Sequence, residues 1–264
     1  MRIPIPFAFF GFAAGAAARR PCVNAAAWSI GHALPALTLA LPALFGANAG
    51  SAAVPVAAPA AAPTPLALPA PALRGTVSLE QALAARRSVR DYAAGALTLA
   101  QLAQLLWAAQ GITATAQGLR TAPSAGALYP LEVYVAVHEV SGLPAGVYRY
   151  LPHTHALQVV VAHSVRAELA RDALAQAAVA RAPATLVLAA VSARTRAKYG
   201  ERAARYVQLE AGHAAQNVLL QTVALGLGTV VIGAFDDARL RRTLALRAGE
   251  EPLCLLPVGR PAGG

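Results

Sequence analysis

The chain has 264 residues, a formal net charge of +10 and 57% hydrophobic residues. All twelve acidic residues lie after residue 74, and the only charged side chains in residues 1–74 are arginines. Basic residues are spread along the chain without the aromatic interleaving or motifs of nucleic-acid-binding domains, which argues against a nucleic-acid partner. The composition thus separates an apolar beginning from a remainder long enough to fold around one hydrophobic core.

Residues 1–50 are expected to be a signal or leader segment. An Arg-Arg pair at 19–20 precedes an apolar run at 33–45, and the small residues 47–49 are typical of a cleavage site. A second candidate site at 16–18 competes with it, and an extension upstream of the true start is the alternative. Export to the periplasm and residence in the cytoplasm both stay open. Membrane contact is expected only through an uncleaved leader.

Residues 51–74, rich in Ala and Pro, are expected to form an extended linker ahead of one domain at residues 75–264. The cysteines are Cys22, in the leader, and Cys254, in an apolar stretch. The domain is therefore expected to contain no disulfide.

Two capping boxes mark the first helices of the domain. Residues 78–81 open a helix to about residue 86, and residues 98–101 open another through residue 109, which Gly111 ends. Helices and apolar strands then alternate, which predicts an α+β or α/β sandwich with helices on both faces of one sheet. The predicted strands are 131–138, 146–150, 156–162, 184–191, 229–232 and 253–258, and the later helices are 165–180, 200–226 and one from Asp237.

Two groups of residues are candidates for ligand binding. The loop 121–130 places small residues between prolines just before a buried strand, which is typical of a backbone that approaches a flat ligand. Arg86, Ser88, Arg90 and Arg260 supply guanidinium and hydroxyl donors for a phosphate. Taken alone, the loop is also compatible with an ordinary connector, and the arginines with cations that complement a helix dipole.

The segments Arg86–Arg90, Thr121–Pro130 and Pro257–Arg260 together carry a resemblance to a known family. Between Gly75 and Arg260 the chain resembles the nitroreductase-like flavoproteins, most closely the SagB-type azoline dehydrogenases of peptide natural-product pathways. The resemblance implies a nitroreductase-like fold, a central, mostly antiparallel sheet flanked by helices. It also implies an FMN cofactor and a homodimer whose flavin sites take residues from both chains.

The resemblance also assigns roles to individual residues. It implies that the FMN phosphate binds a basic cluster whose outward-facing member is Arg87, that a small-residue loop lies beside the flavin ring, and that backbone amides after a strand face the flavin N5 edge. The cofactor-binding residues are then Arg86, Arg87, Ser88, Arg90, Arg260, Pro123, Ser124, Ala125, Gly126, Ile232, Gly233 and Ala234.

Lys198 is the only lysine of the chain and stands beside Tyr199. A solvated lysine is the simple interpretation, whereas the resemblance implies catalytic proton handling by this pair. Two substrate hypotheses follow: reduction of a nitroaromatic or quinone with NAD(P)H as electron donor, or oxidation of an azoline in a modified peptide. A non-catalytic flavin-binding or envelope interaction protein is the rival hypothesis.

No metal site is expected. Glu210 and His213 form a single Glu-x-x-His pattern on a predicted helix, whereas di-iron bundles need this motif twice. A packing or interface role is favoured for His213. His153 and His155 flank a turn without a cluster of further ligands.

Overall fold

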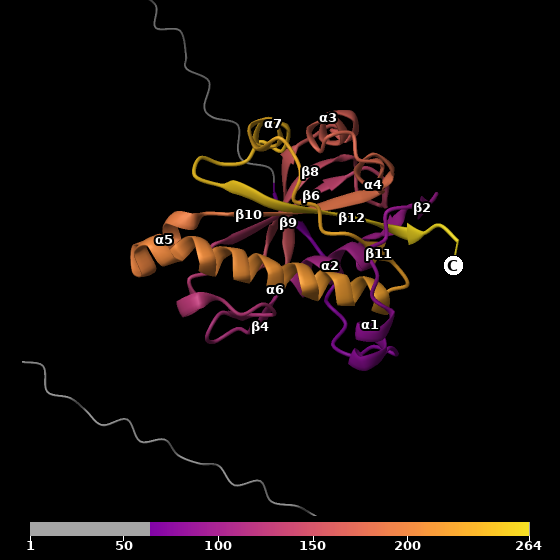
Figure 1. Ribbon diagram of the computed structural model, residues 1–264. Coiled ribbons are helices and arrows are strands. Elements are labelled where there is room, and N and C mark those ends of the chain that lie inside the picture. The colour runs from indigo at the N-terminus through magenta and orange to yellow at the C-terminus, as the bar shows by residue number, and fades with distance from the viewer. Residues whose placement is uncertain (1–63, 264) are drawn as a thin grey trace, which may run out of the picture. The chain divides into compact units, whose positions relative to one another are not determined.

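The computed structural model describes residues 64–263, so the expected leader and most of the linker lie outside the described residues. Seven α-helices cover the two faces of one sheet in this part of the chain (Figure 1). The helices are α1 (Leu79–Ala85), α2 (Leu99–Gln110), α3 (Arg166–Asp172), α4 (Ala177–Arg181), α5 (Ser192–Tyr199), α6 (Ala203–Ala224) and α7 (Asp237–Thr243).

The central sheet is antiparallel throughout, in the order β1-β9-β8-β6-β10-β12-β11, with β2 beside the end of β12. Two short pairs, β3 with β7 and β4 with β5, lie outside it. The predicted α+β class with an antiparallel central sheet is confirmed. The strands are β1 (Leu66–Ala67), β2 (Tyr92–Ala93), β3 (Leu97–Thr98), β4 (Ile112–Ala114), β5 (Leu119–Arg120), β6 (Leu131–Val137), β7 (Val140–Ser141), β8 (Gly146–Leu151), β9 (Ala156–Val161), β10 (Ala184–Ala190), β11 (Gly228–Thr229) and β12 (Glu251–Pro261).

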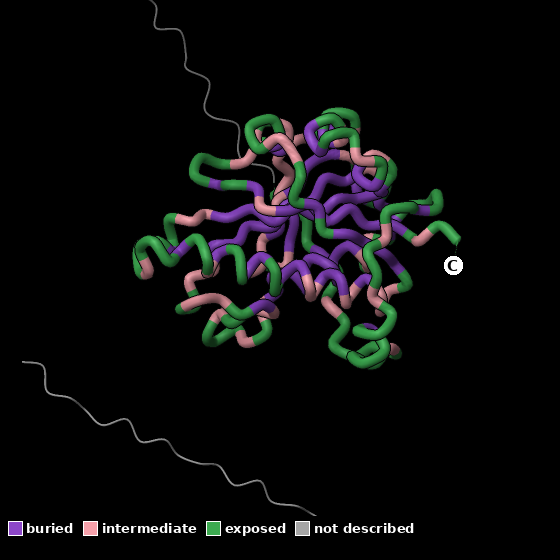
Figure 2. Tube along the Cα trace, in the orientation of Figure 1, coloured by how far each residue is buried: buried purple, intermediate pink, exposed green. Residues whose placement is uncertain are grey.

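Both faces of the sheet are buried because successive side chains of a strand point to opposite sides. In β10, Leu186 and Leu188 enter one hydrophobic core, whereas Val187 enters the other. Helices α1, α2 and α6 lie on the first face, and α3, α4 and α7 lie on the second (Figure 1). Figure 2 shows the strands as a buried layer between exposed helical surfaces. Each fully buried leucine contributes roughly 1.5–3 kcal/mol to folding.

The predicted helix starts are confirmed at atomic detail. The Ser78 hydroxyl accepts a hydrogen bond from the Gln81 amide at 3.1 Å, and the Gln81 side chain accepts one from the Ser78 amide at 2.9 Å. Thr98 and Gln101 repeat this arrangement in α2, which ends at Gly111.

Three elements differ from their predictions. The helix predicted at 165–180 is two helices, because Leu174 and Ala175 between them both adopt a φ of +56°. The strand predicted at 229–232 is shorter, and Ile232 joins β12 only through an isolated bridge to Leu255. Helix α5 was not predicted, since its sequence is polar and has no apolar period.

The end of the expected linker is part of this packing. Leu66 of β1 pairs with Leu157 of β9, and Leu68 is only 9% exposed. The side chain of Gln104 in α2 accepts from the Ala72 amide at 2.8 Å and donates to the Ala72 carbonyl at 3.1 Å. Residues 66–72 therefore pack on the domain. At these positions the chain is not the extended linker without contacts that the sequence predicts. Among residues 64–263 no helix has both the length and the apolar character needed to span a membrane.

Candidate functional site

The two ends of the domain meet at β11. The Val89 amide donates to the Thr229 carbonyl at 3.0 Å, and a Cβ atom on Gly228 would lie 2.6 Å from Val89 Cβ, so glycine is needed for this approach. Arg260, near the end of β12, is paired with Ala93 of β2. The segment 86–90 and the end of β12 thus both border the short strand β11.

Four of the predicted phosphate-binding residues have free donors. Within residues 64–263, the side chains of Arg86, Ser88, Arg90 and Arg260 make no hydrogen bond or ion pair. Arg87 differs, because its Nη1 atom donates to the carbonyls of Ala84 at 2.9 Å and Arg86 at 2.8 Å. Arg87 therefore closes the end of α1, which separates it from the other four.

The loop predicted to lie beside the flavin is held in a strained conformation. Residues Ala125–Ala127 form a single 3₁₀ turn, in which Gly126 has a φ of +64°. Ala127 and Tyr129 also have positive φ, of 54° and 45°, which costs on the order of 1–3 kcal/mol per residue. The Ser124 hydroxyl accepts from the Tyr129 amide at 2.9 Å and so closes the turn. Such strain is typical of functional loops.

The structure brings this loop into contact with the predicted catalytic pair. A Cβ atom on Gly126 would lie 2.8 Å from the Tyr199 hydroxyl and 3.0 Å from Lys198 Nζ. Both side chains come from the end of α5, and the Tyr199 ring packs edge-to-face on Tyr206 with centroids 4.9 Å apart. The absence of a side chain at Gly126 leaves the space that the amine and the phenol occupy.

A buried acid beside the same loop was missed as a candidate. Glu210 of α6 is 2% exposed and its Oε1 atom has no hydrogen-bond partner within residues 64–263. Burial raises the pKa of Glu210 to about 6, against the opposing effects of the Ser124 hydroxyl and Arg120. It lines a pocket of about 280 Å³ with Ser124 and His213. The Glu-x-x-His spacing was visible in the sequence, but only burial distinguishes this glutamate.

The segment predicted to face the flavin N5 edge has two free amides. Ile232 is bonded to Leu255 in both directions at 2.9 Å, so its amide is already used. Gly233 is exposed and a Cβ there would meet nothing within 4 Å, while the Ala234 carbonyl accepts from Gln176 at 2.9 Å. In the described part of the chain, only the Gly233 and Ala234 amides of these three residues are available to a ligand.

The model of the nitroreductase family matches residues 83–260. The chain belongs to the nitroreductase family. Its likeness to individual nitroreductases covers most of the domain. A Methanocaldococcus jannaschii protein named as a nitroreductase is 48% identical over 184 residues, which are 70% of this chain and 91% of the relative. As a member of this family, the chain is a flavin-dependent oxidoreductase.

Solved structures agree with the nitroreductase-like fold. A Ralstonia eutropha structure named as a nitroreductase is 33% identical with a TM-score of 0.67, and the match covers 76% of this chain and 90% of that one. A chain of the E. coli microcin synthetase complex, 23% identical with a TM-score of 0.58, covers 73% of this chain and 77% of its own and shares the fold. The nitroreductase-like fold predicted from the sequence is confirmed, whereas the SagB-type branch is a finer assignment.

Proposed function

We propose that this nitroreductase-family protein uses FMN and holds its phosphate through Arg86, Ser88, Arg90 and Arg260. The observation that carries the proposal is the set of free donors around β11. Arg86 is half-buried and Ser88, Arg90 and Arg260 are exposed, so these donors are accessible to a bound anion, and cations without a bound partner attract one. A phosphate dianion fits this donor set because guanidinium forks and a hydroxyl match its oxygens.

We propose further that each flavin site is built from two copies of the chain. Gly126 lies beside the residues that precede α6, whereas β11 follows the other end of the helix (Figure 1). A helix of 22 residues is about 33 Å long, farther than one flavin mononucleotide reaches. A second copy can supply the loop for the phosphate site of the first.

Exposed leucines support this assembly. Leu79 and Leu83 of α1 are 60% and 52% exposed, and Leu209 of α6 is 53% exposed. Leu79 and Leu83 are four residues apart, so they lie on the same face of α1 and form one exposed apolar strip of the kind that a partner covers. A homodimer would bury them and would place α6 of each copy near the interface.

Bound FMN would supply two-electron transfer as hydride at N5. The residues of the chain would exclude water and move protons around the substrate. Lys198 and Tyr199, which lie beside Gly126, would exchange a proton with a substrate atom, and such proton transfer typically contributes about 10²–10⁴-fold to a rate. The amides of Gly233 and Ala234 would donate to the flavin edge.

The FMN assignment is tested by titrating the flavin-free protein with FMN and following flavin fluorescence. One charge-assisted hydrogen bond contributes roughly 1.5–3 kcal/mol, so Arg90→Ala should weaken FMN binding about ten- to a hundredfold. Arg87→Ala is the matched control and should bind FMN like the wild type, because its guanidinium already serves α1. Equal affinities for all three proteins would refute the assignment.

The substrate class is tested separately with the FMN-loaded protein. Bleaching of the flavin by NADH or NADPH, followed by turnover of a nitroaromatic or a quinone, would establish the reductive function. Oxidation of an azoline-containing peptide without nicotinamide would establish the alternative, which the Lys198–Tyr199 pair favours. Failure of both reactions with bound FMN would favour a non-catalytic flavin protein.

A further inference from the structure

A pocket of about 400 Å³ lies beside the strained loop and takes no part in the proposed flavin site. Three arginines line it: Arg120 of β5, Arg149 of β8 and Arg194 of α5. The acidic side chain in its lining is that of Glu132 of β6. The charge of the lining is therefore positive.

The carboxylate of Glu132 is already fully used. Its Oε2 atom accepts from Arg149 at 2.6 and 3.1 Å, and its Oε1 atom accepts from Arg194 at 2.6 Å. The Glu132 side chain is 9% exposed, and a buried carboxylate needs such partners. The negative charge of Glu132 neutralises one of the three arginine charges. Two positive charges are left without a counterion in the lining.

Of the three arginines, Arg120 makes the fewest hydrogen bonds within the described part of the protein. Its Nη1 atom donates to Gln110 Oε1 at 2.8 Å, and its guanidinium lies 4.4 Å from the centroid of the Tyr129 ring. Burial lowers the pKa of Arg120, while Glu132 opposes this change, as does Glu210 from α6.

Two buried donors of the lining lack partners. Arg120 Nε and Gln110 Nε2 make no hydrogen bond within residues 64–263, and Gln110 is 0% exposed. A buried donor without an acceptor costs about 1–3 kcal/mol, so native proteins rarely leave two on one wall. Both residues line the pocket, so they are candidate donors to an acceptor oxygen bound there.

The rest of the lining defines the body of the ligand. Leu131, Val133, Leu151 and Pro152 form the apolar wall of the lining. We propose that this pocket binds a small carboxylate with an apolar body, with Arg120, Arg149 and Arg194 as its donors. The guanidinium fork matches a planar carboxylate, and the apolar wall favours such a ligand over a hydrated phosphate ion.

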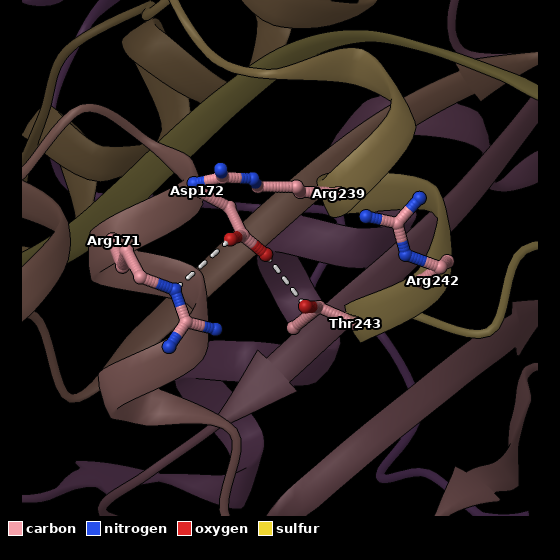
Figure 3. A pocket seen from close by; sticks show the side chains of 5 residues that line it. All are labelled: Arg171, Asp172, Arg239, Arg242 and Thr243. Atoms are coloured by element: carbon pink, nitrogen blue, oxygen red, sulfur yellow. Dashed lines mark hydrogen bonds and ion pairs between the residues drawn. The ribbon is translucent and has the colours of Figure 1, made fainter.

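A second arginine-lined pocket, between α3 and α7, provides a contrast (Figure 3). Its carboxylate, Asp172, is 1% exposed, accepts from the Thr243 hydroxyl at 2.5 Å and lies 3.6 Å from Arg171 Nε. Arg171 and Arg239 have side chains that are 64% and 55% exposed, so water screens them. Arg242, in the same pocket, is a matched control for non-specific anion binding.

The test is isothermal titration of the FMN-saturated full chain with cyclohexanecarboxylate. FMN is saturating so that its phosphate site does not contribute, and the readout does not depend on turnover. The wild type should bind one carboxylate per chain, with cyclohexanecarboxamide and inorganic phosphate at least tenfold weaker. Arg120→Gln and Arg194→Gln should each weaken binding about tenfold or more, and Arg242→Gln should leave it unchanged.

Arg194 is 40% exposed, so its variant tests the proposal even if Arg120→Gln does not fold. Absence of saturable binding to the wild type would overturn the proposal. Equal binding of the amide, tighter binding of phosphate, or unchanged affinity in Arg194→Gln would overturn it as well.

Discussion

Replacing Gly126 with alanine should separate the stability of the loop from its chemistry. The residue has a φ of +64°, where a residue with a Cβ costs roughly 1–2 kcal/mol. For a domain of this size such a loss lowers the Tm by about 2–8 °C. The new Cβ would also lie 2.8 Å from the Tyr199 hydroxyl and 3.0 Å from Lys198 Nζ. Both atoms end flexible side chains, so they would move at little further cost in stability.

Gly118→Ala is the matched control, because Gly118 has a φ of +65° and a Cβ there would meet nothing within 4 Å. Both variants should lose similar Tm in thermal unfolding. Only Gly126→Ala should lose turnover per bound flavin, by about 10²-fold, since a displacement near 1 Å of a catalytic group has that effect. Equal turnover in the two variants would refute a catalytic role for the residues that contact Gly126.

Two further predictions concern stability. Burial, with a smaller contribution from Arg166, lowers the pKa of His138 to about 4. The folded state therefore disfavours the protonated imidazole of His138. The free energy of unfolding should be highest above pH 6.5 and should fall by at most about 3 kcal/mol between about pH 6.5 and pH 4. His138→Gln should flatten this dependence in denaturant titrations at several pH values, and an unchanged slope would contradict the assignment. A chain that starts at residue 75 lacks β1 and buried Leu68, so it should be about 2–4 kcal/mol less stable than one that starts at residue 64. Equal Tm values for the two chains would show that this packing does not contribute.

Local signals explain which elements could be predicted. The capping boxes at Ser78 and Thr98 are fixed by residues three positions apart, and the nearly continuous apolar runs of β6 and β10 reflect burial on both faces. The break at 173–176 depends on two residues with positive φ that are not glycine, for which the sequence has no reliable signal.

The residues of the proposed site could be named from the sequence where short motifs carry them, but not where long-range contacts bring them together. The resemblance predicts a phosphate-binding role for the segment 86–90 and Arg260, and the fold brings both segments to β11. The contact of Gly126 with Tyr199 joins residues far apart in sequence and depends on how α5 is placed. The burial of Glu210 likewise depends on tertiary packing.

Mixed dimers test whether two chains share each flavin site, as we propose. One parent carries Arg90→Ala and Arg260→Ala at the phosphate site, and the other carries Lys198→Ala and Tyr199→Phe beside the loop. Each parent alone should be inactive at limiting FMN. A mixed dimer should regain activity, because one of its two sites combines an intact phosphate site from one chain with an intact loop from the other. A mixture no more active than its parents, with mixed dimers demonstrated by differential tags, would contradict the account.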